Sequence, residues 1–455
     1  MIGEWCLAQL QQQFGGDVTE DVPFSGVSTD TRTIAPGDLF VALVGPTFDG
    51  HEFIEQALAK GAVAAVVSHP VEPSIAQWVV SDTHKALADI ALANRQRFHG
   101  CLYAVTGSSG KTTVKEMLYS ILSQTRSVLA TKGNFNNDIG VPLTLFCLND
   151  EHQAAVIEQG ASAGGEIAYT TALSLPDVAV LTNAMGAHLE GFGSLLGVVE
   201  AKAEIFSQLR KTNGYAIINA DDKYAQFWLG GTEGQKRKTF SCVSDTADIY
   251  ASDIKASDTG CFSFMLHRGE QVVPVQLSVM GQHNVANALA AAAAVSTQEI
   301  SLQQIAEGLH RFKAVKGRMC PVKGPQGALV IDDSYNANPG SVNAAVDLLV
   351  SLPGESILVL GDMAELGADA AEQHKKVGCR AAQKGAGSLW ATGALSRHSV
   401  SAFNAELPGC GKYFETQEEL SAALLGAARQ NTNILIKGSR SAAMERVVNS
   451  LSEGD

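Results

Sequence analysis

The chain has 455 residues, which at about 150 residues per domain favours three domains and excludes a single small binding module. Hydrophobic residues make up 45% and charged residues 18%, a balance that excludes a disordered or collagen-like chain. With 33 Lys and Arg against 47 Asp and Glu, the formal net charge of -14 disfavours broad attraction to nucleic acid or to anionic lipid.

Two further features of the sequence indicate a cytoplasmic protein. The eight cysteines are scattered without a C-x-x-C pair, which favours reduced thiols over a disulfide framework or a zinc site. No Lys or Arg precedes Arg32, and the longest apolar run, Ala288 to Val295, is far shorter than the about 18 residues that span a bilayer. We therefore expect neither a signal peptide nor an integral membrane segment.

In chain order, a small mixed α/β piece ends near Thr83, and a different pattern begins at Leu102. From there a short apolar run, a Gly-rich or polar loop and a helical pattern recur, which predicts a parallel sheet. The predicted strands are Leu102–Val105, Ala154–Ile157, Val178–Leu181 and Tyr215–Ile218. Ligands of open α/β sheets lie beyond the carboxyl ends of the strands, so polar residues there should converge. These residues are Thr106, Glu158, Thr182-Asn183 and Asn219 to Asp222.

The hydrophobic pattern of the sequence changes again between Ala247 and Met280. Period-two alternation there predicts an antiparallel insertion with a turn at Arg268-Gly269-Glu270. An Ala-rich helix from about Asn284 to Val295 follows, and Arg311 to Gly317 forms a polar crossing segment. Further strands are predicted at Ala328–Ile331, Ser356–Leu360, Ser388–Trp390 and Ile434–Ile436.

The predicted fold class is therefore α/β with three domains. Residues 1–84 form a small mixed α/β domain. Residues 85–312 form a central P-loop ATPase-like domain with a parallel sheet and the antiparallel insertion, and residues 313–455 form a Rossmann-like domain.

The segment Thr106 to Thr113 predicts a phosphate-binding loop, because it lies between a strand and a helix whose apolar residues recur at about 3.6-residue spacing. Glycines let backbone N–H groups wrap a polyphosphate, and the helix N-terminus adds its dipole. Lys111, exposed on the loop, reaches the terminal phosphates, and Thr112 ligates Mg²⁺. Val105 replaces a glycine of the strict pattern, so an ordinary Gly/Ser-rich turn is the alternative. The ATP-binding residues predicted here are Gly107, Ser108, Ser109, Gly110, Lys111, Thr112 and Thr113.

Two residues beyond neighbouring strands are candidates for holding the metal. Glu158 ends a strand, where P-loop proteins place an acid for Mg²⁺. His188 follows Thr182-Asn183 and can reach the same crevice. From the residues alone, a solvated loop charge is the alternative for Glu158, and a surface or capping residue is the alternative for His188.

Several segments together resemble the corresponding parts of a known family. They are Tyr103–Glu116, Glu158–Ala161, Asn183–Phe192, Gly281–Asn287 and Asp332–Pro339, with Ser25–Leu43, Gly361–Gly367 and Lys437–Arg440 extending the match over essentially the whole chain. The family that they resemble is the Mur ligases, ATP-dependent amide-bond-forming enzymes of peptidoglycan synthesis. One departure is Gln159, where the family more often has an apolar residue.

The resemblance implies an acid–amino-acid ligase with ATP, Mg²⁺, UDP-N-acetylmuramoyl-tripeptide and D-alanyl-D-alanine as ligands. The Asp-Asn-Pro-Arg motif of the meso-diaminopimelate-adding paralogue is absent, which favours the dipeptide as acceptor. The implied reaction passes through an acyl phosphate and releases ADP and phosphate, with Lys111 and two Mg²⁺ ions neutralising charge. We expect a monomer without a nucleic-acid partner.

The resemblance also implies a metal site that includes a modified lysine. It makes Glu158 and His188 ligands of Mg²⁺ together with Thr112. It further implies that the neutral amine of Lys202 takes up CO₂, and that the carbamylated Lys202 helps to hold the second Mg²⁺, because an ammonium cannot ligate a cation. Lys111, His188 and Lys202 are thus the implied catalytic residues. Without the resemblance, Lys202 would be interpreted as a solvated helix lysine.

The remaining ATP contacts are implied by the resemblance as well. His283, Asn284 and Asn287 would contact the adenine end, although N-capping of a helix is an equal alternative for Asn284. Arg318 would contact phosphate and Asp333 would hold the ribose. Because these two residues lie in the third domain, ATP would bridge two domains and closure would complete the site.

Three groups of residues are expected to bind the other substrates. Ser28, Asp30 and Arg32 match a pattern associated with the uridine nucleotide, with a capped turn and a surface ion pair as the alternative. The expected contacts to the sugar-peptide substrate are Asn134, Asn136 and Asn137, and those to the incoming dipeptide are Tyr335, Asn336 and Asn338.

Two alternative functions stay open at this point. One is another amino-acid-adding Mur ligase or a folylpolyglutamate synthase-like ligase, which shares the phosphate chemistry but takes other substrates. The other, from a different class, is a P-loop nucleotide switch.

Overall fold

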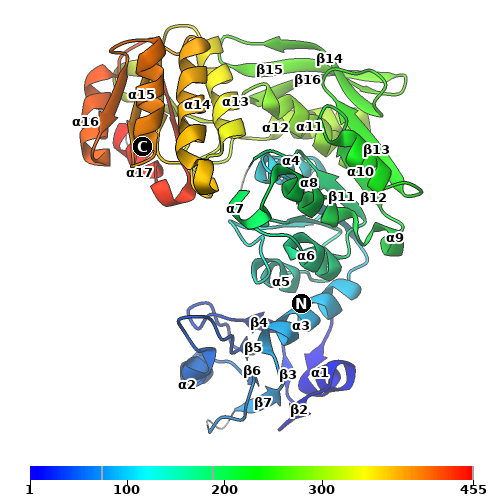
Figure 1. The fold of residues 1–455 in the computed structure, drawn as a ribbon. Coiled ribbons are helices and arrows are strands. Elements are labelled where there is room, and N and C mark those ends of the chain that lie inside the picture. The colour runs from blue at the N-terminus through cyan, green and yellow to red at the C-terminus, as the bar shows by residue number, and fades with distance from the viewer. Residues whose placement is uncertain (73–74, 187–188, 453–455) are drawn as a thin grey trace.

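The computed structural model describes residues 1–72, 75–186 and 189–452, and it contains three regions that are each built around a β-sheet (Figure 1). The first region is blue and lies at the bottom of Figure 1, the central region runs from cyan to green, and the C-terminal region runs from yellow to red. The predicted α/β fold class is confirmed. The domain limits at residues 84/85 and 312/313 stay predictions.

The first region holds a five-stranded mixed sheet in the order β2-β7-β6-β5-β4. Its strands are β2 (Asp17–Val18), β4 (Gly26–Ser28), β5 (Asp38–Val41), β6 (Ala64–Val67) and β7 (Ala76–Val79), and a separate pair is formed by β1 (Trp5–Cys6) and β3 (Pro23–Phe24). The helices are α1 (Leu7–Phe14), α2 (Ile54–Ala59) and α3 (Thr83–Gln96). Asp82 caps α3 by accepting hydrogen bonds from the N–H groups of His84 and Lys85. Because α3 packs against the central region, the first region is tied to the central sheet through this helix.

The central region holds a nine-stranded sheet in the order β16-β15-β14-β13-β12-β11-β8-β10-β9. The strands are β8 (Cys101–Thr106), β9 (Val128–Ala130), β10 (Ala154–Glu158), β11 (Val178–Leu181), β12 (Tyr215–Asn219), β13 (Lys236–Ser241), β14 (Ile249–Ala256), β15 (Cys261–Arg268) and β16 (Gln271–Met280). The four predicted parallel strands and the predicted antiparallel hairpin are confirmed. The structure adds that β14 pairs in parallel with β13, so the predicted insertion extends the central sheet itself.

Helices cover both faces of this central sheet. They are α4 (Lys111–Leu122), α5 (Gly140–Phe146), α6 (Glu166–Ser174), α7 (Leu189–Phe192), α8 (Leu195–Ala203), α9 (Leu209–Thr212), α10 (Ala225–Gly231), α11 (His283–Val295) and α12 (Leu302–Arg311). On one face α4, α11 and α12 share a core with the strands, and on the other face α6 and α8 do so. Strands β8, β10, β11 and β12 are buried on both faces, which explains why they occur as continuous apolar runs in the sequence.

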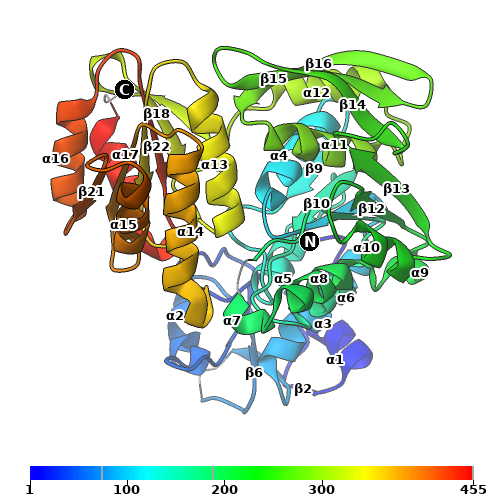
Figure 2. The same cartoon turned by 45° about the horizontal axis from the view of Figure 1, so that its top comes forward.

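The C-terminal region holds a six-stranded sheet in the order β17-β18-β22-β19-β20-β21. The strands are β17 (Cys320–Lys323), β18 (Leu329–Asp333), β19 (Glu355–Leu360), β20 (Ser388–Thr392), β21 (Gly411–Phe414) and β22 (Thr432–Lys437). The helices are α13 (Pro339–Ser351), α14 (Ala370–Gln383), α15 (Ser396–Glu406), α16 (Gln417–Ala427) and α17 (Glu445–Leu451). Helices α13 to α15 cover one face and α16 and α17 the other, as the turned view makes clear (Figure 2).

Apolar contacts join the C-terminal region to the central one. Met280, at the end of β16, is buried in the core that α13 forms with its sheet. Gly260, in the turn before β15, lies so close to Leu348 and Leu352 that a side chain there would crowd them. Across the described part of the chain, no helix is both long enough and apolar enough to cross a membrane.

Candidate functional site

A cavity of about 570 Å³ lies between the central and C-terminal regions. Its central wall is formed at the carboxyl ends of β8, β10, β11 and β12, and its C-terminal wall at the carboxyl ends of β18 and β22, so the expected convergence of polar residues occurs. The predicted site residues that line it are Ser108, Ser109, Gly110, Lys111, Thr113, Asn134, Asn136, Asn137, Glu158, His283, Asn284, Asn287, Arg318, Asp333, Tyr335, Asn336 and Asn338.

The phosphate loop is held in place by the segment that follows β11. The N–H of Ser108 donates to the Asn183 carbonyl at 3.0 Å, and the N–H of Ser109 donates to the Asn183 side chain at 3.0 Å. Gly107 and Gly110 have φ angles of 148° and 82°, and a Cβ at either position would overlap Thr182 or Asn287. Both glycines are therefore required by backbone conformation and by close neighbours. Helix α4 starts directly after the loop, at the cavity. The unpaired N–H groups of its first turn are therefore available to an anion bound there.

Lys111 is the first residue of α4, and the expectation that it is exposed on the loop is wrong. Its side chain is half-buried, and its ammonium donates to the Gly107 carbonyl at 2.8 Å. Burial lowers the pKa of Lys111 below its usual range, Arg318 acts in the same direction and Glu158 opposes it. Two charged groups from opposite walls of the cavity therefore act on this ammonium.

The side chains of Thr112 and Glu158, two of the predicted metal ligands, lie side by side. Glu158 is buried, and its two oxygens accept hydrogen bonds of 2.9 Å from Thr112 Oγ1 and from Asn136 Nδ2. Neighbouring oxygens around Mg²⁺ lie about 2.9 Å apart when each Mg–O bond is about 2.0–2.1 Å, so this pair fits one edge of an octahedral site. Within residues 1–72, 75–186 and 189–452, no group of three or more His, Cys, Asp or Glu side chains could hold a metal. A Mg²⁺ ion at this position would thus draw further ligands from phosphate and water, as is usual for this ion.

Lys202 lies on α8 and is a buried residue, not the solvated helix lysine that the sequence alone suggested. It is only 2% exposed, its ammonium lies 3.5 Å from the Ala161 carbonyl, and Ala161 lines the cavity. Burial lowers the pKa of Lys202 to about 7, and the nearby charge of Lys111 adds to the effect. Burial therefore favours the neutral amine of Lys202. His188, the other expected metal ligand, lies outside the described residues.

Three residues at the start of α11 face the cavity from the central wall. The side chain of Asn284 donates to the Met280 carbonyl at 2.7 Å and accepts from Asn287 at 2.8 Å. Since the N-cap position belongs to Gln282, Asn284 does not cap the helix. His283 has its pKa lowered by burial, with Asp333 opposing and Lys437 reinforcing this shift, so it faces the C-terminal wall.

The C-terminal wall has two charged features: an aromatic ring flanked by two arginines, and a buried ion pair. The Arg318 guanidinium lies 4.3 Å and that of Arg440 5.9 Å from the centre of the Tyr335 ring. Asp333 pairs with Lys437, whose ammonium also donates to the carbonyl of Asn336 at 2.9 Å. This wall can therefore supply both positive charge for phosphates and a carboxylate for hydroxyl groups.

The residues expected to bind the uridine nucleotide do not line this cavity. The N–H of Asp30 donates to the buried Ser28 hydroxyl at 3.2 Å, and Asp30 pairs with Arg32 at 2.6 Å. Hydrogen bonds from Arg32 hold the pKa of Asp30 below its usual range, although the Arg32 side chain is 85% exposed. The capped turn and surface ion pair considered as the alternative are thus present, and nucleotide binding by these three residues stays a prediction.

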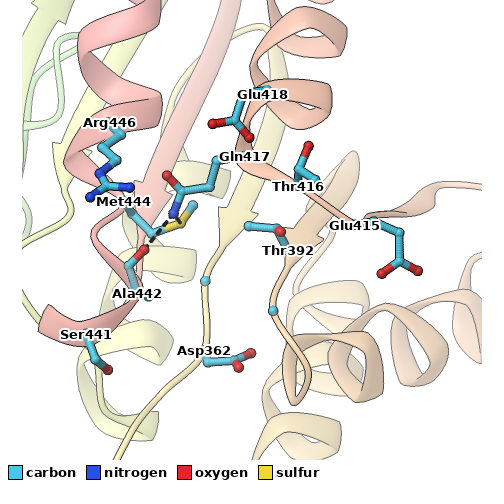
Figure 3. Close-up of a pocket in the computed structure, with 12 residues that line it drawn as sticks. Asp362, Thr392, Glu415, Thr416, Gln417, Glu418, Ser441, Ala442, Met444 and Arg446 are labelled. Atoms are coloured by element: carbon cyan, nitrogen blue, oxygen red, sulfur yellow. Dashed lines mark hydrogen bonds between the residues drawn. The ribbon is translucent and has the colours of Figure 1, made fainter.

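A second pocket, of about 380 Å³, occupies the other part of the carboxyl edge of the C-terminal sheet (Figure 3). Acidic side chains of Asp362, Glu415 and Glu418 line it, and Arg446 is the one lining cation in the described part of the chain. Asp362 accepts hydrogen bonds from the backbone and hydroxyl of Ser396, so it holds the start of α15. An acidic lining repels polyphosphate, which favours the larger cavity as the nucleotide site.

Comparison with known proteins gives the family of this chain. Three family models match it: "Mur ligase family, catalytic domain" over residues 23–96, "Mur ligase middle domain" over residues 105–295, and "Mur ligase, glutamate ligase domain" over residues 317–440. The chain is 45% identical over 450 residues to the UDP-N-acetylmuramoyl-tripeptide–D-alanyl-D-alanine ligase of Escherichia coli strain K12, with 98% of each chain covered. The chain belongs to the Mur ligase family.

Solved structures of Mur ligases resemble the whole chain. A crystal structure of MurF from Acinetobacter baumannii has a TM-score of 0.91 at 35% identity and covers 100% of both chains. A structure of MurF from Thermotoga maritima in complex with ADP has a TM-score of 0.81 at 29% identity, covering 93% of this chain and 96% of that one. The three-region architecture is therefore that of a Mur ligase.

The structure of this Mur ligase shows the environments of two residues, Lys437 and Gln159, that the sequence did not predict. Lys437 lines the cavity and pairs with Asp333, yet in the sequence it only ends a short apolar run. Its position beyond the carboxyl end of a parallel strand was the available signal. Gln159 was noted as a departure beside Glu158, but its side chain is fully buried and bonds Thr171 and Ser174 of α6, away from the cavity.

Proposed function

We propose that this Mur ligase joins D-alanyl-D-alanine to UDP-N-acetylmuramoyl-tripeptide, with conversion of ATP to ADP and phosphate, in the synthesis of peptidoglycan precursors. The observation that carries the proposal is one cavity in which Lys111 and the Thr112–Glu158 pair face Arg318 and Asp333. The printed name of the Escherichia coli relative states this substrate pair, and the Thermotoga maritima structure holds ADP.

The reaction needs a carboxylate to become an acyl donor. A carboxylate oxygen of the tripeptide attacks the γ-phosphorus of ATP, the bond to the β-phosphate oxygen breaks, and ADP leaves. The neutral amine of the dipeptide then attacks the acyl carbon and loses a proton to solvent, and phosphate leaves with the oxygen that came from the carboxylate. Lys111, on the central wall, neutralises the charge that builds up on the phosphoryl group, and Arg318, on the opposite wall of the cavity, contacts a phosphate of ATP.

Thr112, Glu158, His188 and Lys202 form the proposed metal-binding set. Mg²⁺ bound there would act as a Lewis acid on the phosphoryl oxygens. Glu158 is held for this role by Asn136. The neutral amine of Lys202 adds to CO₂ and releases a proton to solvent, which gives an anionic carbamate. Burial of Lys202 supports this step, because only the neutral amine is nucleophilic.

The other substrate contacts follow the same arrangement. We assign His283, Asn284 and Asn287 to the adenine end of ATP, Asn134, Asn136 and Asn137 to the sugar-peptide substrate, and Tyr335, Asn336 and Asn338 to the dipeptide. All nine line the cavity. Ser28, Asp30 and Arg32 of the first region are assigned to the uridine nucleotide. The enzyme is proposed to act as a cytoplasmic monomer, and its eight unbridged cysteines support that compartment.

Phosphate release from ATP tests the proposal directly. We expect release only when UDP-N-acetylmuramoyl-tripeptide and D-alanyl-D-alanine are both added, and one peptide bond for each phosphate. Replacing the dipeptide by single amino acids, or the tripeptide by a folate, should abolish release. Equal release with another acceptor would assign a different ligase step, and release that ignores every acceptor would favour a nucleotide switch.

A further inference from the structure

Lys437 is a buried cation with no role in the steps derived above. It ends β22, its side chain is 3% exposed, and it lines the cavity between the two regions. In the sheet it lies directly opposite Asp333 of β18, so the backbone register fixes the two residues side by side. Burial of an ammonium costs desolvation free energy, which only an opposite charge and hydrogen-bond acceptors can offset. The partners of Lys437 therefore indicate what its charge does.

The ammonium of Lys437 contacts two parts of the loop after β18. It lies 2.5 Å from Asp333 Oδ2 and donates to the Asn336 carbonyl at 2.9 Å. Among the described residues, the other oxygen of Asp333 accepts one hydrogen bond, a long one of 3.3 Å from the Met319 N–H. Lys437 is therefore the main partner that fixes the direction of the Asp333 carboxylate.

The two residues that Lys437 contacts are assigned to different substrates in the proposed function. Asp333 is assigned to the ribose of ATP and Asn336 to the dipeptide, and Tyr335 between them carries the ring beneath Arg318. We propose that Lys437 is a positioning residue that couples the two subsites, holding the ATP-side carboxylate and the dipeptide-side loop with one ammonium. The inference rests on the proposed function and adds the coupling of its two binding steps.

Removal of the ammonium should loosen both contacts together. In Lys437→Met a side chain of similar length remains, but the Asp333 carboxylate loses its cation and the Asn336 carbonyl loses its donor. We expect the KM for ATP and the KM for the dipeptide each to rise about tenfold, since each loses about one hydrogen bond to a charged group. Asp333→Asn should raise the KM for ATP alone.

A set of four variants tests the coupling with separate KM and kcat measurements for both substrates. In Lys437→Met combined with Asp333→Asn, the KM for ATP should be no higher than in the worse single variant, because both changes break one contact. The KM for the dipeptide should equal that of Lys437→Met. The control is Lys412→Met on β21, whose ammonium lies over the Trp390 ring; neither residue lines the cavity, so both KM values should match the wild type.

The outcomes separate this inference from the proposed function. A folded Lys437→Met enzyme with a wild-type KM for the dipeptide would overturn the coupling, and so would additive effects on the KM for ATP. If Lys437→Met fails to fold, Lys437→Gln serves instead, because its amide keeps a donor but is too short to reach both partners. A wild-type enzyme that ignores the dipeptide would overturn the proposed function first, whatever the variants do.

Discussion

The two walls of the cavity hold their functional side chains in different ways. On the central wall, Lys111 bonds the carbonyl of Gly107 and Thr112 bonds Glu158, so these groups are fixed within one sheet edge. On the C-terminal wall, Arg318 lies over Tyr335, and Asp333 depends on Lys437. Each wall is thus fixed by contacts within its own region, but the central wall holds groups proposed to act on the phosphoryl group, whereas the C-terminal wall holds groups proposed to bind ATP and the dipeptide. Changes to the first wall should therefore lower kcat, and changes to the second should raise KM.

The largest effect is expected for Lys111→Ala on the central wall. Loss of the ammonium removes a charge aimed at the phosphoryl group, so kcat should fall about 100- to 1000-fold. The melting temperature should hardly change, because the one hydrogen bond lost is to the neighbouring loop.

A surface lysine provides the control for that variant. Lys375→Ala on α14, where the side chain is 54% exposed, should keep wild-type kcat. Near wild-type turnover in Lys111→Ala would remove the phosphate loop from the mechanism and with it the contrast between the walls.

The second effect concerns Lys202, which lies behind the central wall. Lys202→Ala should lose at least about tenfold in kcat, and formate or acetate should partly restore it by taking the place of the carbamate. Removal of CO₂ should lower the wild-type rate reversibly. The control Lys211→Ala, an exposed lysine on α9, should respond to neither treatment.

The pKa of Lys202 also predicts the direction in which CO₂-dependent activity changes with pH. A pKa of about 7 leaves about one tenth of Lys202 neutral at pH 6 and about nine tenths at pH 8, so CO₂-dependent activity should rise over this range. Full activity of Lys202→Ala, or a CO₂ effect that grows towards acid pH, would contradict the carbamate.

A smaller effect is expected on the C-terminal wall from Tyr335→Leu. The ring contact with Arg318 is worth about 0.5–2 kcal/mol, so the KM for ATP should rise several-fold while kcat stays near the wild-type value. The KM for the dipeptide should rise as well, because Tyr335 is assigned to that substrate. Tyr413→Leu is the matched control, because its ring carries Arg397 at 4.9 Å elsewhere in the same region. If Tyr335→Leu lowered kcat alone, the division of roles between the walls would be wrong.

The smallest effect on activity is expected for Gln159→Leu, next to Glu158. The amide bonds Thr171 and Ser174 away from the cavity, so kcat should stay within about twofold, while the free energy of unfolding falls by about 1–3 kcal/mol. Adding Thr171→Val and Ser174→Ala should recover much of the stability, since no unpaired polar group is then left. A large loss of kcat would contradict this and would show that Gln159 helps to position Glu158.

The sequence predicted the strands that are buried on both faces and the residues at their ends, because apolar runs followed by polar loops are a strong local pattern. It missed β13, whose Lys-Arg-Lys start has no apolar run although the strand lies inside the sheet. The burial of Lys202 and the pairing of Lys437 with Asp333 could not be predicted from the sequence either. Both depend on segments far apart in the chain, and the position of Lys437 at the carboxyl end of a parallel strand was a local signal for its place in the site but not for its partner.

The central claim is that this cavity activates the tripeptide as an acyl phosphate, and an oxygen label tests it most directly. UDP-N-acetylmuramoyl-tripeptide carrying ¹⁸O at both oxygens of its terminal carboxylate is incubated with ATP, Mg²⁺ and D-alanyl-D-alanine, and the released phosphate is analysed by mass. The account predicts one ¹⁸O atom in each phosphate, because the oxygen that attacks the γ-phosphorus leaves with it. Phosphate without the label, with ligation proceeding, would contradict the account.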